Sequence, residues 1–146
     1  MIFFILLVLF GGAAAATQVV VNSQLRNWVG HPVLATFFSF LTGAVVLFVY
    51  VLVLRIPRPE LTKTLQAPWW VWLGGVLGAF YVFSTIVAAP KLGAAVLIGV
   101  AVTGQMLISL LLDHFGLFGL PRHPVSIWRL LGAGLLLLGV AIIRSK

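Results

Sequence analysis

Cysteine is absent from this sequence, and only two of its residues are acidic. Without cysteine the chain has no disulfides, no thiolate metal sites and no cysteine nucleophile. Its histidines, His31, His114 and His123, are far apart and lie near the ends of apolar runs. No catalytic motif stands out either. We therefore expect no metal, no cofactor and no enzymatic activity.

Charge of either sign is scarce, at 8% of residues, whereas 62% of residues are hydrophobic. Soluble domains have roughly 25% charged and 45–50% apolar residues, so this composition indicates an integral membrane protein. The formal net charge is +7, but the basic residues are scattered singly or in pairs near span ends. Anionic lipid headgroups are the expected partner of these charges, and nucleic acid is not.

Apolar runs between charges and prolines predict five membrane-spanning helices. They cover residues of about 2–22, 32–54, 68–89, 92–113 and 126–143, within one transmembrane domain of residues 1–146. Pro90 and Lys91 divide the longest run into two spans, because proline interrupts the helical ladder and lysine resists burial in lipid. The first run resembles a secretory signal but lacks a basic start, so we interpret it as a retained span. The predicted fold is an all-α membrane bundle.

The distribution of Lys and Arg hardly favours either orientation of the chain in the membrane. One set of span ends carries five basic residues: Arg55, Arg58, Lys63, Arg122 and Arg129. The opposite set carries four: Arg26, Lys91, Arg144 and Lys146. Either another signal or a partner sets the orientation, or the chain inserts both ways and pairs antiparallel with itself. The second interpretation reproduces the inverted-repeat arrangement of transporters, in which a site lies near the membrane midplane.

Small and polar residues recur at helical spacing on four of the five spans. The four stripes are Gly11, Ala15, Gln18 and Asn22; Thr36, Ser39, Gly43 and Tyr50; Gly74, Gly78, Tyr81 and Thr85; and Ala101, Gln105, Ser109 and Asp113. Hydroxyl groups in such stripes often only join neighbouring helices. A buried amide is more demanding, since each unpaired polar group costs about 1–3 kcal/mol.

We therefore predict a shared polar pocket that binds a small-molecule substrate. Its expected lining residues are Gln18, Asn22, Ser39, Tyr81, Gln105 and Ser109, with Asn22 nearer the rim. Asp113 and His114 are the plausible titrating pair for coupling to protons or cations. The alternative is that Asp113 is a surface carboxylate paired with His114, Arg122 or Arg129. The last span has no polar side chain between its flanking arginines, and Gly132 and Gly139 predict close helix packing within or between subunits.

Four segments resemble the YdcZ-like proteins, a bacterial family of the drug/metabolite transporter superfamily. They are "QVVVNSQL" (18–25), "GHPVLATFFSFLTG" (30–43), "APKLGAAVLIGVAVTGQMLISLLLDHFGLFG" (89–119) and "RLLGAGLLLLGVAI" (129–142). The resemblance implies a multi-pass inner-membrane transporter of small molecules. It also implies a five-helix unit that works as an antiparallel pair, formed by two copies, with a paired homologous subunit, or within a fused ten-span protein.

The distantly similar small multidrug resistance exporters use a glutamate in their first span to bind cations and protons alternately. This chain has no acidic residue there, so that exchange cannot be carried over. Neutral, zwitterionic or anionic substrates fit an amide-bearing span more easily. A small dual-topology ion channel and a non-transporting membrane scaffold subunit remain as alternative functions.

Overall fold

The structure, a computed structural model, describes residues 1–145 as helices and connecting loops, without a strand in that range. Lys146, which the charge balance includes, lies outside the described residues. Within them, five helical segments are long and apolar enough to cross a membrane: Ile2–Val29, Pro32–Val53, Trp69–Leu92, Ala94–Phe115 and Ile127–Arg144. The prediction of an all-α protein with five spans is confirmed.

Glycines in the left-handed region define two of the helix ends. The first helix, α1 (Ile2–Val29), continues past the predicted end near residue 22, because its polar last turns are still compatible with a helix. It ends at Gly30 (φ 79°), whose N–H donates to the carbonyl of Arg26 at 2.9 Å. Pro90 lies inside α4 (Leu73–Leu92), and the break before α5 (Ala94–Phe115) comes at Gly93 (φ 72°).

The chain divides into two compact units, one of residues 1–90 and one that begins at Lys91. The first contains α1, α2 (Pro32–Val53), α3 (Leu61–Leu65), the 3₁₀ turn η1 (Trp69–Trp72) and most of α4. Its small core is formed by Ala35 of α2 and by Val82 and Ile86 of α4, all buried. Leu25, Val29 and Tyr81 pack against them.

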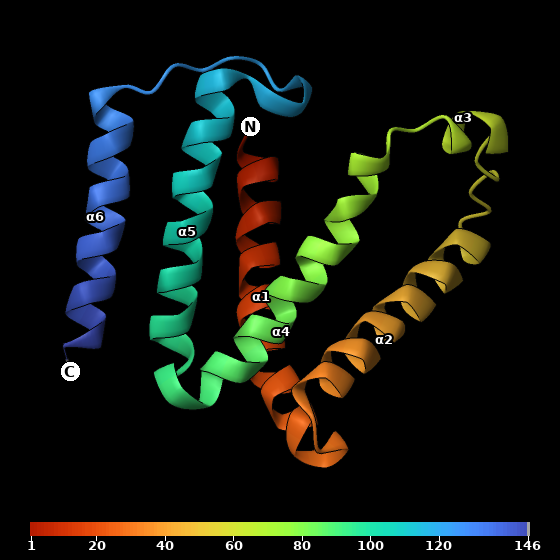
Figure 1. The fold of residues 1–146 in the computed structure, drawn as a ribbon, viewed down its shortest axis with the longest axis horizontal. Coiled ribbons are helices and arrows are strands. Elements are labelled where there is room, and N and C mark those ends of the chain that lie inside the picture. The colour runs from red at the N-terminus through yellow and green to blue at the C-terminus, as the bar shows by residue number, and fades with distance from the viewer. Residues whose placement is uncertain (146) are drawn as a thin grey trace. The chain divides into compact units, whose positions relative to one another are not determined.

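Within this first unit, α2 and α4 are close where α2 begins and α4 ends, and they diverge toward the loop that carries α3 (Figure 1). The turn between α1 and α2 is short because His31 and Pro32 start the new helix at once. Pro32 occupies the first turn, where its missing N–H is not needed, and His31 Nδ1 accepts a hydrogen bond from the N–H of Val33 at 3.2 Å.

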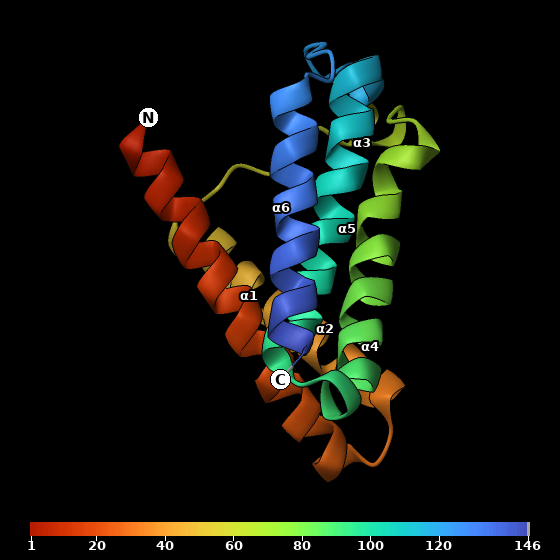
Figure 2. The same cartoon turned by 90° about the vertical axis from the view of Figure 1, so that its left-hand side faces the viewer.

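The second unit is a hairpin of α5 and α6 (Ile127–Arg144), which lie side by side in both views (Figures 1 and 2). The connecting loop includes the turn η2 (Leu117–Gly119). The helices approach closely at Gly99, where an added Cβ would lie 2.7 Å from Cγ2 of Val140. Ser126 caps α6 by accepting a hydrogen bond from the N–H of Arg129 at 3.4 Å.

Candidate functional site

Three of the predicted substrate-binding residues line one cavity of the first unit. Gln18 comes from α1, Ser39 from α2 and Tyr81 from α4. The cavity, called the polar pocket below, has a volume of about 410 Å³. Its remaining lining residues are apolar or glycine: Phe40, Gly43, Ala44, Leu47, Gly78 and Val82. The structure therefore brings together three of the side chains that helical spacing had placed on polar stripes, and their role in substrate binding stays a prediction.

The polar groups of this pocket are available to a ligand. Within the described residues, Gln18, Ser39 and Tyr81 make no side-chain hydrogen bond, and the Gln18 side chain is exposed. The hydroxyls of Thr36 and Thr85, by contrast, donate to carbonyls of their own helices at 2.9 and 2.8 Å. An amide, a hydroxyl and a phenol thus offer both donors and acceptors. No charged residue lines the pocket.

Asn22 is placed differently from the expected position near the rim. It lies one turn after Gln18 on α1 and is only 4% exposed, and it does not line the polar pocket. Among residues 1–145, its Nδ2 has no hydrogen-bond partner. Buried amides are normally paired, so this donor departs from the usual pattern.

Ser109, Asp113 and Gly132 meet in a second cavity, called the charged pocket below, which lies in the α5–α6 hairpin. Its volume is about 330 Å³, and Met106, Leu110, Arg129 and Ala133 complete the lining. Arg129 Nη1 lies 3.2 Å from Oδ2 of Asp113. Both side chains are about one-third exposed, at 37% and 34%. This geometry matches the alternative from the sequence in which Asp113 is a carboxylate paired with Arg129.

His114 supports the loop between α5 and α6. Its Nδ1 accepts a hydrogen bond from the N–H of Val125 at 3.1 Å, and its carbonyl accepts one from Nε of Arg122, also at 3.1 Å. The first bond requires an unprotonated Nδ1. Within the described residues, the His114 ring has no hydrogen bond to the Asp113 carboxylate. Coupling through Asp113 and His114 stays a prediction.

The remaining predicted residues, Gln105, Gly132 and Gly139, belong to the second unit. Gln105 is exposed on α5, and its contribution to the polar pocket stays a prediction. An added Cβ on Gly132 or Gly139 would meet nothing within 4 Å. The glycine that allows close packing inside the chain is Gly99, which the sequence reading missed. Its spacing from other small residues could have indicated it. Among the described residues, no group of three His, Asp or Glu side chains is placed to hold a metal ion.

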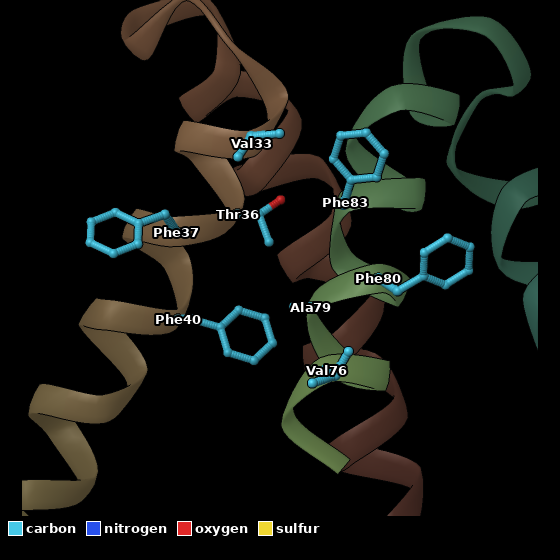
Figure 3. A pocket seen from close by; sticks show the side chains of 8 residues that line it. All are labelled: Val33, Thr36, Phe37, Phe40, Val76, Ala79, Phe80 and Phe83. Carbon is cyan, nitrogen blue, oxygen red and sulfur yellow. The ribbon is translucent and has the colours of Figure 1, made fainter. Parts of the chain in front are cut away.

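A larger cavity, called the aromatic pocket below, lies between α2 and α4 (Figure 3). Its volume is about 540 Å³, and its lining residues are Val33, Thr36, Phe37, Phe40, Val76, Ala79, Phe80 and Phe83. The sequence reading missed this cavity. The signal was a pair of phenylalanines three residues apart on each of two spans, which puts each pair on one helix face.

The comparisons with known proteins agree with the five apolar helices. A family described as "Putative inner membrane exporter, YdcZ" matches residues 3–142. The chain belongs to this family. The Inner membrane protein YdcZ of Escherichia coli (strain K12) is 35% identical to it over 78 residues.

That alignment covers 53% of this chain and 52% of the relative, so the chain spans about half the length of the curated relative it matches. No solved structure matches the chain. The family and the five apolar helices together assign this YdcZ-family protein to the inner membrane as a multi-pass protein.

Proposed function

We propose that this protein transports a small molecule across the inner membrane by alternating access, as an antiparallel dimer with a polar pocket at its centre. The family description supplies the class of activity, which is export. The observation that carries the proposal is the convergence of Gln18, Ser39 and Tyr81, three unpaired polar side chains, on one cavity in an otherwise apolar protein.

The partner is a second copy of this chain, or else a homologous subunit in the opposite orientation. The nearly even distribution of Lys and Arg supports insertion in both directions. Gly132 and Gly139 on α6 support a packing face between subunits, because each has open space where a side chain would be. Small residues allow the close backbone approach that favours helix association in lipid.

The substrate-binding role of the polar pocket is tested by Gln18→Leu. Leucine keeps the approximate size of the side chain and removes its donors and acceptor, so export should fall to the level of cells without the protein. Gln24→Leu is the matched control, because Gln24 is an exposed glutamine of the same helix that lies outside the pocket. Within residues 1–145, its Oε1 accepts a hydrogen bond from Nδ2 of the exposed Asn27 at 3.3 Å.

The measurement is an untargeted mass-spectrometric comparison of the medium of cells that produce each variant. A compound that accumulates with the unmodified chain and with Gln24→Leu, but not with Gln18→Leu, supports the proposal. Export that survives Gln18→Leu at full level would remove the pocket assignment. Rapid, non-saturating ion flux from proteoliposomes would instead indicate a channel.

The antiparallel arrangement can be tested by labelling a single introduced cysteine, because the chain has no cysteine of its own. Ser145→Cys places one thiol just after α6, and an impermeant thiol reagent is added to whole cells before and after permeabilisation. Labelling of about half the protein from outside would be the signature of dual insertion. Labelling of all or none would indicate a fixed orientation and an oppositely oriented partner. Gly139→Leu should then reduce dimer crosslinking, whichever partner is used.

A further inference from the structure

The polar pocket and the aromatic pocket share one side chain, Phe40 of α2. The ring of Phe40 reaches from α2 toward α4, where Val76 and Ala79 lie (Figure 3). It packs against the backbone of Gly78, since a Cβ added there would lie 3.3 Å from Cζ of Phe40. Gly78 lines the polar pocket and its neighbour Ala79 lines the aromatic pocket. The two cavities are therefore adjacent parts of the first unit, with the Phe40 ring as their common wall.

The two cavities offer opposite chemistry. The polar pocket presents unpaired groups on Gln18, Ser39 and Tyr81. In the aromatic pocket the only polar side chain is Thr36, whose hydroxyl already donates to the carbonyl of Pro32 at 2.9 Å. The rest of that lining is four phenylalanines and small aliphatic side chains. One end of the combined site therefore suits hydrogen-bonding groups and the other suits an apolar or aromatic body.

Neither lining contains a charged residue. A charged ligand at membrane depth needs an opposite charge or many polar partners, and these linings provide neither a carboxylate nor a cationic side chain. The aromatic pocket is within the range of about 300–1,000 Å³ that holds drug-sized molecules. Its size, and the Phe40 side chain that it shares with the polar pocket, favour a small molecule as its occupant.

We infer that the transported substrate is an uncharged amphipathic molecule that occupies both cavities at once. Its polar group bonds to Gln18, Ser39 and Tyr81, and its apolar body packs against Phe40 in the aromatic pocket. Phe40 is the specificity-determining residue, because it is the side chain that lines both cavities. This inference rests on the proposed transport function and names the substrate class of the same site.

The test uses the full chain in lipid nanodiscs and three naphthalene probes that differ in one group. They are 2-naphthamide, which is uncharged, 2-naphthoate, which is anionic, and 2-naphthylmethylammonium, which is cationic. Binding is measured by equilibrium dialysis, with empty nanodiscs as the blank for partition into lipid. We expect saturable binding of 2-naphthamide that is at least tenfold tighter than that of either charged probe. Binding that is equal for the three probes, or absent for 2-naphthamide, overturns the inference.

Two variants locate the bound probe. Phe40→Ala should weaken the binding of 2-naphthamide at least tenfold. Phe48→Ala is the control and should leave that binding unchanged, because Phe48 is an exposed phenylalanine of the same helix that lines neither cavity. Gln18→Leu should remove the preference for 2-naphthamide over unsubstituted naphthalene. Full binding to Phe40→Ala would contradict the two-part site.

The same variants distinguish failure of this inference from failure of the proposed transport function. If Gln18→Leu stops export but Phe40→Ala alters neither export nor binding, the polar pocket is supported as the substrate site and the amphipathic substrate class is refuted. If neither variant alters export, the polar pocket itself is wrong. If the Phe40→Ala variant instead yields monomers where the unmodified chain yields crosslinked dimers, the aromatic pocket is an interface with a second copy. That result also overturns the inference.

Discussion

Asn22 provides the sharpest test of how this fold uses its few polar side chains. Asn22→Leu keeps a side chain branched at the same carbon and removes the buried amide. In the structure that amide is 4% exposed, and its Nδ2 has no partner among residues 1–145. A buried donor without a partner costs about 1–3 kcal/mol. The variant should therefore raise the free energy of unfolding by about that amount.

Asn27→Leu is the matched control, because it makes the same exchange on an exposed face of the same helix. Both variants gain the same small benefit from leucine in a helix. A surface substitution of this kind usually changes stability by less than about 0.5 kcal/mol. Asn27→Leu also removes the exposed hydrogen bond from Asn27 Nδ2 to Gln24 Oε1, so the difference between the two variants reports burial together with the loss of that bond.

The assay is unfolding of the purified chain in mild detergent by titration with sodium dodecyl sulfate, followed by the loss of helical circular dichroism. A loss of stability above about 1 kcal/mol in Asn22→Leu would refute the reasoning, because it would mean that the amide is paired in the folded protein. Export by the same variant gives a second readout. Asn22 does not line the polar pocket, so a fall in export by this more stable variant is the result that would support its predicted role in substrate binding.

Two further predictions concern the α5–α6 hairpin. Gly99→Ala should lower the free energy of unfolding by about 1–3 kcal/mol, because its Cβ would lie 2.7 Å from a stiff β-branched side chain, and Val140→Ala in the same chain should restore it. Gly104→Ala is the control and should be neutral or stabilising, since nothing lies within 4 Å of its added Cβ. Asp113→Asn should cost less than about 1 kcal/mol, as expected for an ion pair that is one-third exposed, and should leave the pH profile of export unchanged. A flattened profile would instead make Asp113 a coupling group.

Part of the candidate site was predictable because helix geometry translates spacing into direction. Gln18, Ser39 and Tyr81 were assigned to one pocket from the small and polar stripes on three spans, and the structure brings them together. The aromatic pocket was not predicted, because phenylalanine packs equally well against lipid, a neighbouring helix or a ligand. Those four rings come to line one cavity only because α2 and α4 are neighbours in the tertiary structure.

Composition and hydropathy by themselves determined that the protein is an all-α membrane protein with five spans, since the cost of placing charge and unpaired backbone in lipid depends on the residues alone. Tertiary structure decided the burial of Asn22 and the choice of Gly99 for close packing. The physical reason is that lipid is as apolar as the helices themselves. No hydrophobic force then selects which face turns inward, and the choice depends on how the side chains of neighbouring helices fit in three dimensions.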